Sequence, residues 1–414
     1  MRILELPAVV LKQLLENFCF DELLFLSFCS NRFKNLIRSN QHYRFKTIKT
    51  ITYILSTDDT FYICGDPNVS QVLTRPILGV ILSPFPVKTK TSLIKIFGME
   101  RGTVCIVNSS PWWATTYLYD SNQKQVVIQG VHDYIYHLFG SSIDYHFKST
   151  NTELPPILKN VSSSHINVSE ENTPEELESY FKEMPIQDYF KLEGNLKDRL
   201  ILNSVIYGTE YLEIDSYGRY GDEILLNFRG RYLVFRGMKF RDSTIIQFLN
   251  EWKTHKKFQD LKTVKIGYHT GFDSFNIMAN TDVKHLNPAE DTLLVKWKKR
   301  RMVDIFSIVK SKEISFESRD YLIRDADGRG ASLHFSRRRF MFVVWDSIEN
   351  THIKPSVVPI AISFFDTVLD VTHSSLSTKM TTFQFWKDGF CQKNPLGKMP
   401  DLNSFSTEID ILFS

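Results

Sequence analysis

The chain begins with residues 1–39, MRILELPAVVLKQLLENFCFDELLFLSFCSNRFKNLIRS, which hold more apolar side chains than a short segment can bury within itself. Leu11, Leu14, Leu15 and Phe18 are spaced i, i+3, i+4 and i+7, and this spacing places them on one face of a helix. So small a helical unit has little interior relative to its surface. We therefore expect part of this apolar face to be left uncovered by its own chain and to meet another surface.

Three short helices are expected in this segment. Pro7 suits the first turn of the first helix, where its missing N–H costs nothing, and Asp21 is expected to cap the second. Ser30 or Asn31 is expected to cap the third. The apolar positions of the second helix are Leu23, Leu24, Leu26 and Phe28, and those of the third are Phe33, Leu36 and Ile37.

The order of these residues resembles the F-box family over residues 1–46. The pair Leu6-Pro7 is followed by apolar residues at 11–15, by the run 21–30 and by an amphipathic stretch at 32–37. The resemblance implies docking on a Skp-type linker protein, which tethers the chain to a cullin-based ubiquitin ligase. An ordinary amphipathic helical unit packed on its own chain is the alternative. The residues that the resemblance assigns to partner binding are Leu6, Pro7, Leu11, Leu14, Leu15, Leu23, Leu26, Phe33, Leu36 and Ile37.

Composition indicates a folded chain of two or three domains, because it has 414 residues of which 43% are apolar and 13% aromatic. A formal net charge of +3 is too near balance for a dedicated nucleic-acid-binding protein. Neither a membrane-spanning run of about eighteen apolar residues nor a signal peptide is expected, since charged residues interrupt the first segment. We expect an intracellular protein, cytoplasmic, nuclear or both, whose five widely spaced cysteines form neither a disulfide framework nor a zinc site.

The middle of the chain is expected to contain strands and then a linker. Short β-branched runs separated by turn residues predict a β-rich region over 47–150, including a strand at QVVIQG, residues 125–130. A Pro pair among many Ser and Asn residues marks 151–172 as a linker. Thr173 then begins a helix, because Glu176 lies at the capping-box spacing and Pro174 at the first helical position.

Residues 222–268 predict a strand-helix-strand unit that is reminiscent of one leucine-rich repeat. Strands are expected at 224–228, 232–235 and 264–268, with a helix capped by Asp242 between the last two. We find no second copy of the unit, so a solenoid is not expected. This region also resembles the type-2 F-box-associated domain of the nematode-type F-box family, and 321–345 resembles the hairpin that usually ends such proteins. Residues 351–414 match nothing in that family.

The expected fold class is therefore α+β. It comprises a three-helix F-box (1–46), the β-rich region (47–150), the linker (151–172) and a mixed α/β F-box-associated domain (173–350) with one leucine-rich-repeat-like unit. A tail of unassigned structure follows at 351–414.

Few residues suggest chemistry. The run 325–330 mimics the start of a calcium loop, but Ser336 stands where the bidentate Glu belongs, so we expect a hairpin turn at Asp327-Gly328. His132, His137 and His146 lack metal-ligand spacing and are expected to be structural. Basic clusters at 296–301 and 337–339 are interpreted as solvated faces, although a role in nuclear import stays open. No catalytic or phosphate-binding motif occurs, so we expect no enzyme, cofactor or metal.

These expectations combine into one hypothesis about function. The resemblance implies a substrate-recognition adaptor of an SCF-type ubiquitin ligase, in which the F-box binds the Skp-type linker and the C-terminal domain binds a target protein. A protein-interaction scaffold outside any ligase is the alternative from a different class. The sequence does not identify the target, since specificity resides in surface positions rather than in the fold.

Overall fold

The computed structural model describes residues 6–67, 78–84, 104–107, 115–267, 271–286, 293–298, 313–336 and 338–345. All of them belong to one compact unit, residues 4–354. The expected tail at 351–414 lies outside the described residues, as do Arg337 and the basic residues 299–301.

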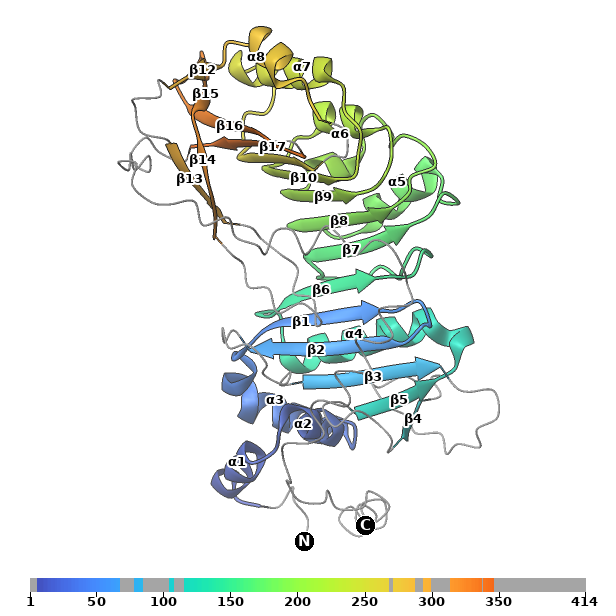
Figure 1. Ribbon diagram of the computed structural model, residues 1–414. Helices are drawn as coiled ribbons and strands as arrows, with labels where there is room; N and C mark the ends of the chain where they lie inside the picture. The colour runs from blue at the N-terminus through green and yellow to red at the C-terminus, as the bar shows by residue number, and fades with distance from the viewer. Residues whose placement is uncertain are drawn as a thin grey trace, which may run out of the picture. The chain divides into compact units, whose positions relative to one another are not determined.

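Three helices open the described chain, as the sequence predicts: α1 (Ala8–Glu16), α2 (Phe20–Ser27) and α3 (Asn31–Phe45) (Figure 1). Ser30 caps α3 as expected, because its side chain accepts a hydrogen bond from a backbone N–H of the first turn. The expected cap at Asp21 is wrong. The N-cap of α2 is Cys19, and Asp21 lies within the first turn, where a carboxylate interacts favourably with the helix dipole.

Within the described residues, a sheet of 15 strands follows the three helices, in the spatial order β12-β15-β16-β17-β11-β10-β9-β8-β7-β6-β1-β2-β3-β5-β4. A separate antiparallel pair is formed by β13 (Leu293–Lys298) and β14 (Glu313–Ser318). The strands of the large sheet are β1 (Ile48–Leu55), β2 (Phe61–Pro67), β3 (Leu78–Pro84), β4 (Val104–Val107), β5 (Thr115–Tyr119), β6 (Asp144–Ser149), β7 (Ser163–Val168), β8 (Tyr189–Gly194), β9 (Tyr211–Asp215), β10 (Tyr232–Arg236), β11 (Thr263–Gly267), β12 (Lys284–His285), β15 (Asp320–Ile323), β16 (Gly330–Ser336) and β17 (Arg339–Val344).

The centre of this sheet is a series of parallel strands in chain order. Each strand from β6 to β11 pairs in parallel with the next one along the chain, and β1 joins the series beside β6. Successive parallel strands joined by crossover connections, several of which contain a helix, are the arrangement of stacked repeats. The expectation of a single strand-helix-strand unit without further copies is therefore wrong.

Helices cover one face of the parallel strands. These are α5 (Pro174–Glu183), α6 (Gly221–Asn227) and α7 (Asp242–Lys253), which Figure 1 shows along one side of the sheet. Alternate strand residues such as Phe190, Leu212 and Leu233 share one buried cluster with apolar residues of these helices. Because side chains alternate between the two faces of a strand, the intervening residues lie on the opposite face, which we call the helix-free face.

The structure corrects three local predictions. The expected strand at 125–130 lies in helix α4 (Lys124–Phe139), and the expected strand at 224–228 begins within α6. The expected linker, 151–172, contains β7, which is hydrogen-bonded between β6 and β8. The sheet thus continues without interruption across the boundaries that we expected between the β-rich region, the linker and the following domain.

Other local predictions are confirmed. Thr173 and Glu176 form the capping box of α5, with Pro174 at its first position. The expected helix and the strands on either side of it are α7, β10 and β11, but the expected cap at Asp242 is wrong, because the N-cap is Arg241 and Asp242 is the first residue of the helix. β15 and β16 form the hairpin expected around Asp327-Gly328, where Gly328 has a φ of 69°.

Candidate functional site

The three N-terminal helices are held together by polar contacts at the end of α1. The guanidinium of Arg44 on α3 donates hydrogen bonds to the carbonyls of Leu15 and Phe18, at 3.0 and 2.8 Å. A cation at these carbonyls complements the negative end of the helix dipole. Tyr43 donates a hydrogen bond to the carboxylate of Glu16, which raises the pKa of the Tyr43 hydroxyl. These contacts fix the orientation of α1 on α3.

The expected partner-binding residues separate into two groups. Leu11, Leu15, Leu23, Phe33 and Ile37 are buried within the chain itself. The chain itself covers these five side chains, where they fix the geometry of the helices. Their contact with a partner stays a prediction. The other five residues reach the surface: Pro7 is exposed, and Leu6, Leu14, Leu26 and Leu36 are partly exposed.

An exposed apolar stripe runs along α1. Val10 and Leu14 are spaced i and i+4, so they lie on the same side of α1, and Leu6 precedes the first residue of the helix. Val10 is 46% exposed and its neighbour Val9 is 70% exposed. We call Leu6, Val9, Val10 and Leu14 the α1 stripe. The sequence prediction omitted both valines because it followed the face of Leu11 and Leu15, which proves to be the interior one.

The opposite side of the three-helix unit packs against the rest of the chain. Tyr134 of α4 donates its hydroxyl to Ser27 of α2, with 2.8 Å to the carbonyl oxygen and 2.8 Å to Oγ. The ring of Phe45 meets that of Phe139 with centroids 4.7 Å apart. Burial raises the pKa of Tyr134 to about 12, so its hydroxyl remains a hydrogen-bond donor at neutral pH. α4 therefore anchors the helical unit to the sheet.

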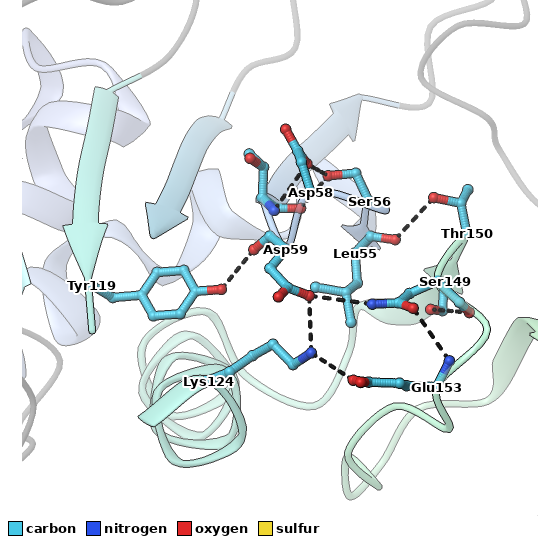
Figure 2. A network of polar contacts seen from close by, with 11 residues as sticks. Leu55, Ser56, Asp58, Asp59, Tyr119, Lys124, Ser149, Thr150 and Glu153 are labelled. Carbon is cyan, nitrogen blue, oxygen red and sulfur yellow. Dashed lines mark hydrogen bonds and ion pairs between the residues drawn. The ribbon is translucent and has the colours of Figure 1, made fainter. Parts of the chain in front are cut away.

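A polar cluster around Asp59 holds α4 in turn (Figure 2). Asp59 lies in the turn between β1 and β2 with a φ of 61°. Its carboxylate accepts from Lys124, the first residue of α4, at 2.9 Å and from Asn151 at 3.2 Å. Lys124 also contacts Glu153 at 2.9 Å. Burial opposes the charged form of Lys124, but the two carboxylates hold its pKa above the ordinary value, so it stays a cation and serves as a clamp rather than a base.

Tyrosines form the first row on the helix-free face. Tyr189, Tyr211 and Tyr232 are register partners at the start of β8, β9 and β10. Their ring centroids lie 5.1 and 5.7 Å apart along the row. Tyr189 donates a hydrogen bond to the carboxylate of Glu213, and burial together with this carboxylate raises the pKa of Tyr189 well above its ordinary value.

Charged side chains form the next rows on the helix-free face. Lys191 lies 2.7 Å from a carboxylate oxygen of Glu193 and 3.4 Å from one of Asp215. Arg236 lies 2.9 Å from the carboxylate of Glu213. His165 donates a hydrogen bond to the carboxylate of Glu193, and Lys191 lies beside it. Burial raises the pKa of Glu193, but these two contacts outweigh it and hold the pKa well below its usual range. Two basic side chains, Lys191 and Arg236, thus balance three carboxylates on neighbouring strands, those of Glu193, Glu213 and Asp215.

The sequence contains a signal for these rows that was not among the predicted features. Residues 189–193, 211–215 and 232–236 read YFKLE, YLEID and YLVFR. Each begins with Tyr, places apolar residues at the second and fourth positions and ends with a charged residue. This is the recurring pattern of the stacked strands, and it identifies both faces of the sheet.

The other residues that suggested a metal or catalytic site make contacts that stabilise the fold. His132 is buried between the hydroxyl of Tyr53 and the carbonyl of Lys159, as expected of a structural histidine. The Asp327 carboxylate accepts two hydrogen bonds from the guanidinium of Arg324. Within the described ranges, no group of three or more His, Cys, Asp or Glu side chains is arranged to hold a metal ion. No helix in the part of the chain that the structure describes is long and apolar enough to cross a bilayer.

Comparison with known families gives one match. The F-box domain family model matches residues 3–45, which contain α1, α2 and α3 and the whole α1 stripe. No curated protein and no solved structure matches the chain. F-box domains generally bind Skp-type linker proteins. The chain therefore carries an F-box domain at residues 3–45, and this domain supports the expected resemblance to F-box proteins.

Proposed function

We propose that the chain is a substrate-recognition adaptor of an SCF-type ubiquitin ligase. Its F-box binds a Skp-type linker and, through it, a cullin, while the stacked strands bind a target protein. The observation that carries the proposal is the α1 stripe: apolar side chains that the chain leaves exposed, within the segment matched by the F-box family. Exposed apolar surface on an otherwise packed helical unit is typical of a protein-binding face.

The proposed contribution is proximity rather than chemistry. An adaptor raises the effective concentration of a target lysine beside the ubiquitin-charged enzyme and needs no nucleophile of its own. Cys19 lies in the F-box, and partial burial of its thiol raises the pKa to about 11. The thiol is therefore protonated at neutral pH and is a poor nucleophile. We propose accordingly that the chain is not an enzyme and needs no cofactor.

The part of the helix-free face that reaches the surface, around Tyr232 and Arg236, is the proposed target-binding side of the chain. Tyrosine and arginine are enriched at the centres of protein interfaces, and both occur there, in Tyr232 and Arg236. Ion pairs of Lys191 with Glu193 and of Arg236 with Glu213 keep the charged side chains in fixed positions, which favours a specific partner. We further propose that residues 173–350 are a type-2 F-box-associated domain, as the sequence resemblance to the nematode-type family implies. The proposed location is cytoplasmic, nuclear or both.

A scaffold that works outside any ligase is the second candidate, and one observation favours it. The F-box helices contact α4 and bury five of the ten expected partner residues within the chain. A unit whose helices serve mainly to pack against their own sheet needs no linker protein.

Reconstitution distinguishes these two functions. The full chain is co-expressed with a Skp-type linker, purified and mixed with a cullin. The adaptor function predicts a stable complex of all three proteins on size-exclusion chromatography. A chain that elutes apart from the linker would refute the adaptor function, and a chain–linker pair that fails to recruit the cullin would favour the scaffold.

A further inference from the structure

A charged pocket of about 600 Å³ lies at one edge of the stacked strands. Its wall is formed by the residues that precede β9, β10 and β11 and by the hairpin turn between β15 and β16. Each of these loops contributes charge. The charged residues that line the pocket are Glu210, Arg229, Arg231, Asp260, Lys262 and Arg329.

Positive charge exceeds negative charge in this wall. Arg231 and Glu210 form an ion pair at 3.4 Å and largely offset each other. Arg229 is exposed, and its guanidinium donates to the carbonyl of Ser204 at 3.2 Å. No ion pair among the described residues includes Arg229. A backbone carbonyl leaves the guanidinium's charge unbalanced, so Arg229 offers a full positive charge to the pocket.

Arg329 offers a second positive charge. Its nearest carboxylate is that of Asp327, 3.7 Å away. That carboxylate already accepts two hydrogen bonds from the buried guanidinium of Arg324. Because Arg324 neutralises the charge of Asp327, this carboxylate does not balance the charge of Arg329. The side chain of Arg329 is 46% exposed.

The loops that carry these arginines are hydrogen-bonded to one another. The N–H of Arg229 donates to the carbonyl of Tyr207 at 2.7 Å, and that of Arg231 donates to the carbonyl of Glu210 at 2.9 Å. The next loop joins through Lys262, whose N–H donates to the carbonyl of Arg231 at 2.7 Å. At Gly230 a side chain is excluded, since a Cβ would lie 1.9 Å from the carbonyl oxygen of Thr209. The backbone of the pocket is thus pre-organised, which lowers the entropy cost of binding.

We propose that this pocket binds an acidic segment of the target protein through carboxylate or phosphate groups. The inference rests on the proposed function, in which this part of the chain holds the target. Guanidinium groups match both kinds of anion with paired hydrogen bonds. The pocket admits a few side chains of an extended segment. Two carboxylates in its wall, Glu210 and Asp260, disfavour the continuous polyanion of a nucleic acid.

Fluorescence anisotropy with the full chain, measured both with and without a Skp-type linker, tests the proposal. The probes are fluorescein-labelled peptides of equal length, one rich in glutamate, one carrying phosphoserines and one rich in glutamine, together with a single-stranded oligonucleotide. We expect one or both acidic peptides to bind, and the tighter of the two identifies carboxylate or phosphate as the recognised group. Arg229→Ala and Arg329→Ala should each weaken binding about tenfold. Asp260→Asn should tighten it about threefold, because a repulsive charge is removed.

Arg199→Ala is the matched control, since this arginine is 70% exposed and lies outside the pocket. It should bind the acidic peptides as the native chain does. Equal binding of the glutamine peptide, unchanged binding in Arg229→Ala and Arg329→Ala, or tighter binding of the oligonucleotide would each overturn the proposal. Linker binding is read separately by size-exclusion chromatography. Loss of the linker complex with retained peptide binding would refute the adaptor function alone, and the reverse result would refute the pocket alone.

Discussion

Replacing Val9 and Val10 together by aspartate is expected to weaken linker binding while leaving the fold intact. Both residues lie in the first turn of α1, where backbone N–H groups lack helical partners and a carboxylate is favourable. The native turn contains no acidic residue. Because Val9 is 70% exposed and Val10 46% exposed, the variant loses little packing within the chain. We expect the free energy of unfolding to change by less than about 0.5 kcal/mol.

The expected loss of binding follows from the exposed fractions of the two side chains. Complete burial of one valine side chain contributes about 1.5–3 kcal/mol. Since the chain already covers part of each valine, the burial left for a partner is worth about 2–3 kcal/mol for the pair. This corresponds to a rise in Kd of about 30- to 150-fold, and desolvation of two carboxylates would increase it. Isothermal titration calorimetry with a purified Skp-type linker measures the ratio.

Val126→Asp is the matched control for this variant. Val126 is 60% exposed and lies in the first turn of α4, outside the F-box. Its replacement introduces one carboxylate at a comparable helical position, so the Kd for the linker should not change. If Val9→Asp/Val10→Asp binds the linker within about threefold of the native chain, the α1 stripe is not the contact surface. The proposed function would then lose the observation that carries it.

Three further predictions concern the contacts that hold the F-box and α4 in place. Arg44→Met keeps the aliphatic stem but removes the donors to the end of α1, so it should lower the free energy of unfolding by about 1–3 kcal/mol in urea titrations, whereas the exposed Arg38→Met should not. Asp59→Ala should destabilise the chain about 1–2 kcal/mol more than Asp59→Asn, because Asn tolerates the left-handed backbone and retains an acceptor; equal losses would show that neither matters. Burial lowers the pKa of His132, so the stability that the neutral imidazole contributes is present above the unfolded pKa of about 6.5 and is lost as the pH falls below it. Lowering the pH from 7.5 to 5.5 should therefore reduce the melting temperature less in His132→Gln than in the native chain. The exposed His137→Gln should show the same reduction as the native chain.

The correctly predicted elements are those with strong local signals. The third helix begins at Ser30 and α5 begins with the Thr173 capping box, because in both a side chain satisfies backbone N–H groups that would otherwise lack partners. The hairpin at Asp327-Gly328 was predictable because Gly328, which readily adopts a positive φ, lies between two runs of alternating apolar and polar residues. Each of these signals acts over a few residues and needs no knowledge of distant parts of the chain.

The incorrectly predicted elements depend on tertiary packing. Residues 125–130 are rich in β-branched side chains, which favour strands, yet Val127, Ile128 and Val131 lie on one helical face that packs inside the protein. Residues 163–168 resemble a linker in composition, but a strand in mid-sheet needs only a partner on each side to satisfy its backbone. Local preference was overridden by burial in the first case and by strand pairing in the second.

The candidate site was predicted in part for a related reason. Helical spacing finds the apolar residues of the F-box but does not say which of its two apolar faces is interior. The stronger face, with Leu11 and Leu15, is buried, and the stripe with Val10 and Leu14 is the one left at the surface. The tyrosine and charge rows were missed although the five-residue pattern recurs at nearly equal intervals, because the segments between the copies differ: a short 3-10 helix, Val205–Gly208, separates the first two and α6 separates the last two.

The attachment of the F-box to the sheet has a consequence for the proposed function. α3 ends at Phe45 and β1 begins at Ile48, so no flexible segment separates the linker-binding helices from the first parallel strand. α4 contacts both, through Tyr134 on one side and Lys124 on the other. In the sheet, β1 is hydrogen-bonded to β6, and each strand from β6 to β10 is hydrogen-bonded to the next one along the chain, as far as β11. A target held on these strands would therefore be presented to the ligase at a fixed distance, and an adaptor gains most in effective concentration when its two binding sites are held at a matching separation rather than joined by a long flexible chain.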